Sequence, residues 1–207
     1  MAYRALIPVK TLREAKSRLA PHLTPTQRAT LVLDMLRHVI YVLQASHSLE
    51  AISVVSPDPL VLQQVQAWGA HPLPEEAQGH NPALRAAAQK ELASGATALL
   101  TLSADLPLLQ VDDIQRVIEY SQHYEIVLAS SYEGTGTNAL LVRPPLAVPY
   151  VFGPGSLQRY QAEAQQRHLS SILYTSPGTT FDVDTIEDVR ICRCYQEDQN
   201  TAHASFY

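Results

Sequence analysis

A regular alternation of short apolar runs with longer amphipathic segments constrains the fold of this 207-residue chain more than any other feature. The apolar runs have the length of strands and lie at residues 5–9, 51–55, 97–102, 126–129, 138–142 and 171–174. The run at 97–102 is continuously apolar, as in a strand that is buried on both faces of a parallel sheet. Strands interleaved with helices predict an α/β fold, in which an open sheet carries helices on both faces.

Helix signals fill most of the gaps between these runs. Thr24-Pro25-Thr26-Gln27 combines an N-cap Thr, a Pro at the first helical position and a Gln that completes a capping box. Further helices are predicted before Gly69, from Asn81-Pro82 to just before Gly95, at 112–120, at about 155–168 and from 185 onward. The segment 132–150 breaks the pattern, because its Glu133-Gly134-Thr135-Gly136 turn leads directly into another strand. Part of the sheet is therefore expected to be antiparallel.

Composition and length favour a single folded domain over residues 1–207, with about 197–207 as a C-terminal tail. The chain is 46% hydrophobic and 17% charged, which argues against disorder. No apolar run approaches the roughly 20 residues needed to cross a bilayer, and the N-terminus lacks the apolar core of a signal peptide. We therefore expect a cytoplasmic protein that does not bind membranes.

Several function classes receive no support from the sequence. The 8 histidines are scattered, so a zinc site is not expected. Cys192 and Cys194 are two positions apart in a helical pattern, which places them on different sides and disfavours a disulfide. The net charge of −5 and the absence of a basic face interleaved with aromatic residues argue against nucleic-acid binding.

A strongly basic loop follows the first predicted strand. Lys10, Arg13, Lys16 and Arg18 fall within nine residues of a chain that is acidic as a whole. One interpretation is the solvated start of a helix. We favour a phosphate-binding loop, because Lys and Arg side chains neutralise phosphates without the glycine-rich backbone that other phosphate loops use.

Carboxylates occur where other strands are expected to end. Asp105 follows the continuously apolar run, and Pro107 prevents that strand from continuing. Asp182 and Asp184 alternate in the segment FDVDT, so that they face one side if the segment is extended. Each alone has a plainer interpretation, with Asp105 as a turn residue and Asp184 or Thr185 as a helix cap.

Together these features predict a binding site for a metal-bound polyphosphate. In an open α/β sheet, ligands bind beyond the carboxyl ends of the strands, where the basic loop and the carboxylates are expected to meet. Carboxylate oxygens would hold Mg²⁺ while Lys and Arg hold the phosphates. A second small anion is predicted near Thr137 and Ser156, because neighbouring glycines allow close approach and Ser156 begins a helix. A hairpin turn followed by a capped helix is the alternative there.

Five motifs in register resemble those of a known enzyme family. IPVKTLREAKSRL, LSADLPLL, GTNALL, FGPGSLQRY and DVDTIEDV occur in this order between residues 7 and 189. They resemble motifs of the 2-phospho-L-lactate and phosphoenolpyruvate guanylyltransferases of coenzyme F-420 biosynthesis. The resemblance implies a Rossmann-like three-layer sandwich with a mostly parallel sheet. This is the nucleotidyltransferase (GT-A-like) fold that the family shares with molybdenum-cofactor guanylyltransferase.

The resemblance also implies a reaction and a set of site residues. GMP would pass from GTP to a phosphorylated three-carbon acid, namely phosphoenolpyruvate, 2-phospho-L-lactate or 3-phosphoglycerate, with release of diphosphate. Matching positions give Lys16 and Asp105 as catalytic residues; Lys10, Lys16, Arg18, Asn81 and Asp105 as the GTP-binding set; Thr137, Gly153 and Ser156 as the acid-binding set; and Asp105, Asp182 and Asp184 as Mg²⁺ ligands. Two positions depart from the family pattern, since His80 stands where Leu is expected and Tyr160 where His is frequent.

Two alternatives differ from this prediction in the acceptor or in the chemistry. One is another Mg²⁺-dependent nucleotidyltransferase that acts on a molybdopterin or a sugar phosphate, although the basic loop lacks a glycine-rich opening. The other is a nucleotide-binding regulatory protein without turnover, which would not need the three aspartates. The expected partners are GTP and the small acid, with the product passed to the next enzyme of the pathway. A homodimer is one option for the assembly.

Overall fold

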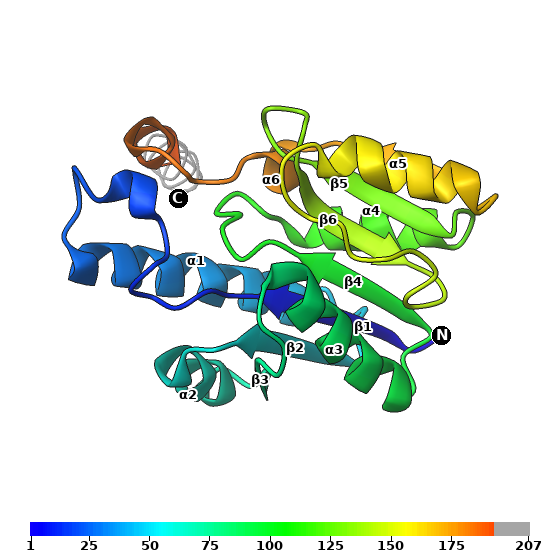
Figure 1. Cartoon of the computed structure of the whole chain (residues 1–207), viewed down its shortest axis with the longest axis horizontal. Helices are drawn as coiled ribbons and strands as arrows, with labels where there is room; N and C mark the ends of the chain where they lie inside the picture. Colours follow the sequence, from blue (N-terminus) through cyan, green and yellow to red (C-terminus); the bar gives the residue numbers. More distant parts are fainter. Residues whose placement is uncertain (193–207) are drawn as a thin grey trace, which may run out of the picture.

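One seven-stranded sheet forms the centre of the computed structural model, which describes residues 1–192 (Figure 1). Its strands lie in the order β3-β2-β1-β4-β6-β5-β7. They are β1 (Tyr3–Pro8), β2 (Ala51–Ser56), β3 (His71–Pro74), β4 (Ala98–Leu102), β5 (Ile126–Ser130), β6 (Thr137–Val142) and β7 (Ser171–Tyr174). Cys194 and the expected tail at 197–207 lie outside the described residues.

The sheet is mixed, as the turn signal after residue 132 predicts. β6 runs antiparallel to both of its neighbours, β4 and β5, whereas the other adjacent strands are parallel. The reason is local, because the chain turns straight back after β5, and Ser131 N–H donates to Gly136 O at 3.1 Å to close the hairpin. Every residue of β4, β5 and β6 is buried. The α/β class and the antiparallel part of the sheet are thereby confirmed.

Helices cover both faces of the sheet. They are α1 (Pro25–Ala45), α2 (Pro59–Ala67), α3 (His80–Ala93), α4 (Val111–Ser121), α5 (Ser156–Gln166) and the short α6 (Pro177–Thr180). Apolar side chains of α1, α2 and α4 pack on one face together with Ala5 and Ile7 of β1. α3 and α5 pack on the other face, where Leu6 of β1 joins the α3 cluster. Side chains that alternate along β1 thus enter two separate cores, which gives a three-layer sandwich.

The structure confirms the predicted N-cap of α1 and corrects the predicted start of α3. Thr24 is the N-cap of α1 as predicted, because its hydroxyl accepts from Gln27 N–H at 3.2 Å and Gln27 Oε1 accepts from Thr24 N–H at 2.9 Å. α3 instead begins with Gly79 as its N-cap, since the Asn81 side chain forms hydrogen bonds with Phe152.

None of the helices in the described part of the chain combines the length and apolar character needed to cross a lipid bilayer.

Two short elements escape the sequence patterns. β3 carries two prolines in four residues, which its place at the edge of the sheet tolerates. α6 is four residues long and is capped by Ser176, whose hydroxyl accepts from Thr179 N–H. The chain that leaves α6 passes the end of β4, where Val183 N–H donates to Asp105 O at 3.3 Å. α6 therefore directs the C-terminal aspartates toward the carboxyl end of the sheet.

Candidate active site

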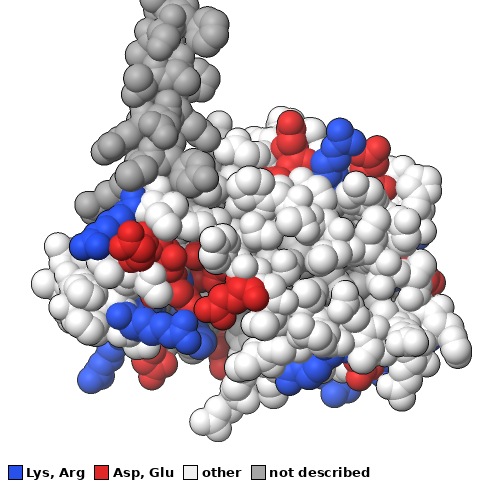
Figure 2. Space-filling model, turned by 90° about the horizontal axis from the view of Figure 1, so that it is seen from above, with Lys and Arg blue, Asp and Glu red and all other residues white. Residues whose placement is uncertain are grey.

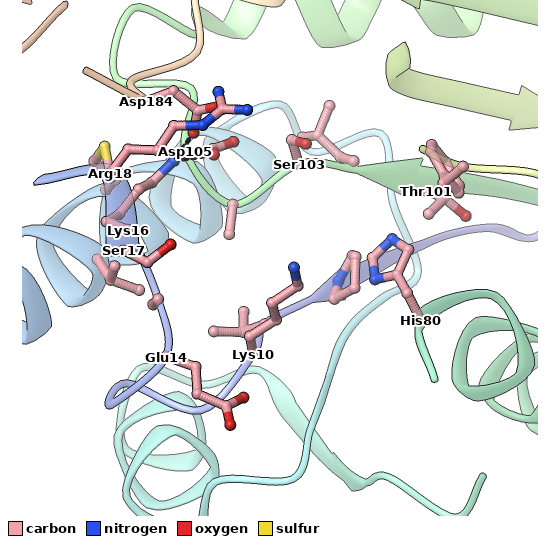
Figure 3. A pocket seen from close by; sticks show the side chains of 18 residues that line it. Lys10, Glu14, Lys16, Ser17, Arg18, His80, Thr101, Ser103, Asp105 and Asp184 are labelled. Carbon is pink, nitrogen blue, oxygen red and sulfur yellow. Dashed lines mark hydrogen bonds and ion pairs between the residues drawn. The ribbon is translucent and has the colours of Figure 1, made fainter. Parts of the chain in front are cut away.

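An open cavity of about 440 Å³ lies beyond the carboxyl ends of β1 and β4, where ligands bind in open α/β sheets. Lys10, Lys16 and Arg18 of the basic loop line it together with Asp105 and Asp184. Figure 3 shows Lys16, Arg18 and the two aspartates grouped on one side of the cavity, with Lys10 apart from them. The structure therefore brings together the basic loop and two of the three predicted metal-binding carboxylates.

Lys16 is the centre of the charged cluster. Its ammonium donates to Asp105 Oδ2 at 2.5 Å and to Asp184 Oδ1 at 3.0 Å, although these residues are 89 and 168 positions away along the chain. Only 9% of its side chain is exposed. Burial lowers the pKa of Lys16, but the two carboxylates outweigh burial and hold the pKa above its ordinary value. Lys16 is therefore a permanently positive group in the wall of the cavity.

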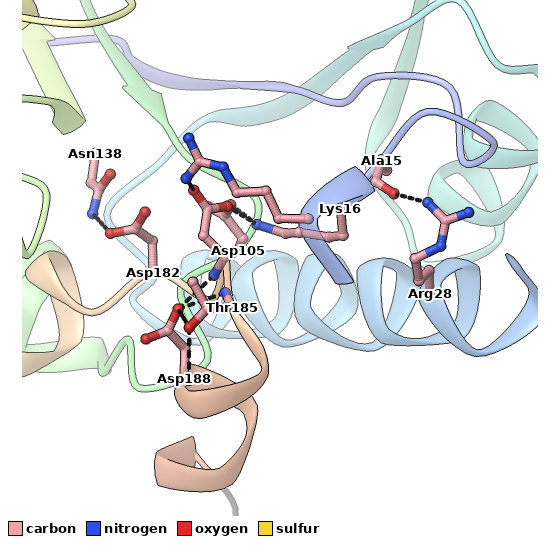
Figure 4. Close-up of polar contacts among 10 residues, drawn as sticks. Ala15, Lys16, Arg28, Asp105, Asn138, Asp182, Thr185 and Asp188 are labelled. Atoms are coloured by element: carbon pink, nitrogen blue, oxygen red, sulfur yellow. Dashed lines mark hydrogen bonds and ion pairs between the residues drawn. The ribbon is translucent and has the colours of Figure 1, made fainter. Parts of the chain in front are cut away.

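The backbone of Lys16 adopts an uncommon conformation. Its φ of 52° and ψ of 43° lie in the left-handed region, which costs a residue with a side chain roughly 1–2 kcal/mol. Arg28 of α1 supports this turn, because its guanidinium donates to Ala15 O at 3.0 Å (Figure 4). Strained backbone that its surroundings maintain is typical of binding and catalytic sites.

A small apolar cluster joins the basic loop to the C-terminal aspartate segment. Leu19 directly follows Arg18 and is completely buried. The buried residues of this cluster are Leu19, Met35, Phe181, Val183 and Val189. Because side chains alternate along an extended segment, Phe181 and Val183 enter the cluster, while Asp182 and Asp184 face polar partners. This packing, together with the ion pairs of Lys16 and Arg18 with Asp184, holds the loop opposite the aspartates.

Leu19→Ala is expected to lower the free energy of unfolding by about 2–4 kcal/mol, because it leaves a cavity in this cluster. GTP binding should weaken in the folded variant, since the cluster also sets the position of the loop. Urea unfolding measures the first effect, and calorimetric titration with GTP measures the second. Leu23→Ala is the matched control, because Leu23 packs against the same cluster but is only partly buried. Equal losses in the two variants would contradict the role of Leu19.

The structure decides between the two interpretations of Asp184. The helical turn that starts at Ile186 is capped by Thr185, whose hydroxyl accepts from Asp188 N–H at 3.3 Å. In return, Asp188 Oδ2 accepts from Thr185 N–H at 2.7 Å (Figure 4). This is a capping box in which the N-cap and N3 residues satisfy each other's backbone. The Asp184 side chain does not cap this helix.

Asp184 faces the basic loop instead. It accepts a hydrogen bond from Lys16 and another from Arg18, the latter at 3.1 Å. Burial raises the pKa of Asp184, but the positive charges of Lys16, Arg18 and Lys10 outweigh burial and hold the pKa below its ordinary value. The carboxylate is therefore ionised at neutral pH.

Asp182 lies beside the ion-pair cluster. Its Oδ1 accepts from Asn138 Nδ2 at 3.1 Å (Figure 4). Burial and the negative charges of Asp105 and Asp184 raise the pKa of Asp182. Within residues 1–192, no three His, Cys, Asp or Glu side chains converge closely enough to hold a metal ion. The positive charge between Asp105 and Asp184 comes from the Lys16 ammonium.

Two of the three residues predicted to bind the phosphorylated acid, Thr137 and Ser156, form a buried pair, whereas Gly153 is exposed. Ser156 Oγ donates to Thr137 Oγ1 at 2.9 Å, and the two residues are 1% and 7% exposed. Gly153 has a φ of 120°, which a residue with a side chain rarely adopts. These three residues are absent from the lining of the 440 Å³ cavity. The structure thus pairs Thr137 with Ser156 but does not place them among the basic loop residues.

Asn81 holds a neighbouring loop in place. Its amide donates to Phe152 O at 3.1 Å and accepts from Phe152 N–H at 2.9 Å. This clamp sets Phe152 in the cavity wall, where its ring meets the His80 ring edge-on with 5.8 Å between centroids. A contact between Asn81 and GTP stays a prediction.

Several cavity residues are not predicted from the sequence as site residues, among them Thr101, Ser103 and Phe152, and His80 stands out there only as a departure from the family pattern. Ser103 and Phe152 stand inside LSADLPLL and FGPGSLQRY, so their position in these motifs is the signal that points to them. Thr101 carries no such signal, because it lies within an apolar strand and its hydroxyl pairs with Tyr150 at 2.8 Å.

Charged side chains of both signs gather at this end of the molecule. Figure 2 shows Lys and Arg next to Asp and Glu at the end where Figure 1 places the basic loop and the chain after α6. Much of the remaining surface on the same face is uncharged. Such a concentration of charge suits a polyanionic ligand, which needs cationic partners close by.

Comparison with known proteins identifies the family. Residues 3–203 match the model of the family described as guanylyl transferase CofC like. The chain belongs to this family. The match includes the basic loop, Asp105 and both C-terminal aspartates, and it confirms the resemblance that the five motifs indicate. The chain is therefore a nucleotidyltransferase, and a regulatory protein without turnover is not favoured.

Curated relatives and solved structures agree with this assignment. A phosphoenolpyruvate guanylyltransferase of Rubrobacter xylanophilus is 42% identical over 190 residues, which cover 91% of this chain and 92% of that protein. A phosphoenolpyruvate guanylyltransferase of Sphaerobacter thermophilus is 40% identical, with 89% of each chain covered. The structure of 4-diphosphocytidyl-2C-methyl-D-erythritol synthase from Anaerococcus prevotii superimposes with a TM-score of 0.66 at 8% identity, covering 95% of this chain and 96% of that chain. This likeness confirms the nucleotidyltransferase fold.

Proposed function

We propose that this protein transfers GMP from GTP to phosphoenolpyruvate and releases diphosphate, in coenzyme F-420 biosynthesis. The names of relatives that are 42% and 40% identical support phosphoenolpyruvate as the acceptor. The observation that carries the proposal is the cluster of Lys16, Asp105 and Asp184 at the cavity, with Lys10 and Arg18 beside it. An acceptor of the molybdopterin or sugar-phosphate type is not favoured, because the family match is to guanylyltransferases of the CofC type.

The reaction makes modest demands on proton transfer. The nucleophile is an oxygen of the acceptor's phosphate, which is already ionised at neutral pH because its second pKa lies near about 6. A general base is therefore not required. The main difficulty is to bring two polyanions together and to hold them in line, which positioning and charge neutralisation accomplish.

The basic loop supplies that neutralisation. Lys10 and Arg18 are exposed at the cavity, and Lys16 contributes a buried positive charge. In the proposed reaction these three groups hold the triphosphate of GTP. They also stabilise the negative charge that builds up on the departing diphosphate. Side chains thereby do what backbone N–H groups do in glycine-rich phosphate loops.

By the chemistry of its donors the site also suits a divalent cation such as Mg²⁺, which would have to draw together carboxylates that do not converge within residues 1–192 of this structure. Asp105, Asp182 and Asp184 offer the carboxylate oxygens that Mg²⁺ prefers. Asp105 and Asp184 already share one cation, the Lys16 ammonium. When bound there, Mg²⁺ would offset the negative charge of the nucleotide phosphates.

Ser156→Ala is expected to raise the KM for phosphoenolpyruvate by about tenfold or more and to leave the KM for GTP nearly unchanged. Loss of a hydroxyl that contacts a charged group typically has an effect of this size. Initial rates measured against each substrate separate the two constants. Ser121→Ala is the control, because Ser121 is a buried serine at the end of α4. Equal changes in both KM values would remove Ser156 from the acid site.

The acceptor is tested by diphosphate release in parallel reactions with GTP, Mg²⁺ and one of three acids. We expect the highest kcat/KM with phosphoenolpyruvate, and lower values with 2-phospho-L-lactate and 3-phosphoglycerate. A clear preference for either of the other acids would replace phosphoenolpyruvate as the acceptor. Absence of release with all three acids would refute the proposed function.

A further inference from the structure

A second compartment adjoins the main cavity on the side of β2 and β3. Its volume is about 200 Å³. It shares Pro8, Val9, Lys10, Glu14 and His80 with the main cavity, so the two are parts of one cleft. Its own lining adds Thr11, Val55, Pro57, Glu75, Gly79 and Ala83. The cleft therefore runs along the carboxyl edge of the sheet, from the aspartates to the end of β3.

This compartment is the part of the cleft best suited to a nucleobase. A nucleotide whose phosphates lie at the basic loop reaches it past Lys10, which lines both compartments. Proline, valine and alanine side chains make up much of its wall and suit the faces of a flat ring. Burial and the nearby Lys10 lower the pKa of His80, so its ring is uncharged at neutral pH and adds another flat surface. Figure 3 shows His80 across the cavity from Arg18 and Asp184.

The Glu75 carboxylate lines this compartment without a partner among the described residues of the protein. Glu75 is half-buried, and its side chain makes no hydrogen bond or ion pair with any residue in the described part of the chain. The next residue, Glu76, is instead paired with Lys90 at 2.6 Å. The backbone of Glu75 is fixed to β2, because its N–H donates to Ser56 O at 3.1 Å. A positioned carboxylate without a partner suits a ligand that donates hydrogen bonds.

We propose that Glu75 selects guanine by accepting hydrogen bonds from its N1–H and its 2-amino group. This inference rests on the proposed use of GTP. Guanine presents these two donors side by side, and an ionised carboxylate offers two acceptor oxygens with matching spacing. Adenine presents an unprotonated N1 at the corresponding edge, and a lone pair there would face the negative carboxylate. Glu75 therefore favours guanine through two hydrogen bonds and disfavours adenine through repulsion between the carboxylate and the N1 lone pair.

A comparison of GTP with xanthosine triphosphate, which differs from it in the 2-substituent of the base, tests this assignment in Glu75→Gln. Glu75→Gln should lower kcat/KM for GTP by about tenfold or more, as expected for the loss of hydrogen bonds to a charged group. The same variant should use xanthosine triphosphate better relative to GTP, by about tenfold or more. Xanthine carries a 2-carbonyl, to which the glutamine amide can donate while its oxygen accepts from N1–H. An unchanged ratio of the two nucleotides in Glu75→Gln would overturn the proposal.

Two further variants separate Glu75 from its neighbours. Glu76→Gln is the matched control and should keep the wild-type ratio, because Glu76 is exposed and paired with Lys90. Glu14→Gln tests the other carboxylate of the compartment. A changed nucleotide ratio in Glu14→Gln, together with an unchanged ratio in Glu75→Gln, would transfer the role to Glu14 and refute the proposal.

A binding measurement keeps the inference distinct from the proposed function. In calorimetric titrations without an acceptor, wild-type protein should bind GTP at least about tenfold more tightly than inosine triphosphate, which lacks the 2-amino group. Glu75→Ala should bind the two nucleotides about equally. Retention of the wild-type preference in Glu75→Ala would refute the role of Glu75 even if the transfer reaction proceeds. Loss of turnover with an intact binding preference would refute the proposed function and leave Glu75 in place.

Discussion

Asp105→Asn should lower kcat by about 100- to 1,000-fold while the protein remains folded. The Asp105 side chain lies at the carboxyl end of β4 and pairs with the Lys16 ammonium. Asparagine has nearly the same shape but no negative charge, so it cannot hold Lys16 or a divalent cation in the same way. The fold tolerates the change because it is the backbone carbonyl of Asp105 that accepts from Val183 N–H at 3.3 Å. Diphosphate release measures kcat, and thermal unfolding followed by circular dichroism checks the fold.

Asp112→Asn provides the matched control for this variant. Asp112 is also an aspartate that follows β4, but it is exposed in the first turn of α4. We expect it to retain wild-type kcat. If Asp105→Asn also retained wild-type kcat, Asp105 would have no part in the chemistry, and the ion-pair cluster would be purely structural.

Lys16→Ala should have the second large effect, with a fall in kcat/KM for GTP of about 100-fold or more. The variant removes the buried positive charge that faces the nucleotide phosphates. It also leaves Asp105 and Asp184 without their shared partner, and 25% and 44% of these side chains are exposed. Because solvent screens the remaining charges, the free energy of unfolding should fall by only about 1–2 kcal/mol. Steady-state kinetics and urea unfolding measure the two effects.

Lys10→Ala separates the contribution of Lys16 to GTP binding from its contribution to the stability of the fold. Lys10 lines the same cavity but is exposed and forms no ion pair in the part of the chain that the structure describes. We expect Lys10→Ala to weaken GTP binding without changing the free energy of unfolding. A loss of stability in Lys10→Ala as large as in Lys16→Ala would show that the buried pairs of Lys16 add nothing specific.

The sheet could be read from the sequence because most of its strands are distinct apolar runs. The sequence predicts β2 at 51–55 and β7 at 171–174, and the structure has these strands at Ala51–Ser56 and Ser171–Tyr174. The sequence does not predict β3, because Pro72 and Pro74 obscure the strand pattern and only the edge position of β3 makes them compatible with pairing. Pairing partners, unlike strand positions, depend on contacts that are distant in the sequence.

The meeting of the basic loop with Asp105 and Asp184 could also be predicted, because the carboxyl ends of neighbouring strands share one edge of the sheet. The burial of Lys16 could not be predicted. It depends on the packing of Leu19 against Phe181 and Val183, which are more than 160 positions away along the chain. The choice between Asp184 and Thr185 as the cap of the following helical turn could not be predicted either, because it depends on the reciprocal hydrogen bonds of Thr185 and Asp188.

The two glutamates after β3 illustrate a further limit of sequence reasoning. Glu75 and Glu76 are identical neighbours in the segment LPEEAQ, and no local pattern distinguishes them. In the structure, Glu76 pairs with Lys90 of α3, whereas Glu75 lines the compartment next to the basic loop. Only the three-dimensional arrangement distinguishes the carboxylate in a surface ion pair from the one that lines the cavity.

The central claim is that one site joins the α-phosphate of GTP to the phosphate of a small acid. Phosphorus NMR of wild-type protein with GTP, Mg²⁺ and phosphoenolpyruvate tests this claim most directly. We predict the signals of a new guanosine diphosphate ester and of free diphosphate, which should rise in equal amounts as GTP disappears. Formation of GDP and inorganic phosphate without the diester would contradict the account, because it would show hydrolysis at the terminal phosphate rather than transfer of GMP.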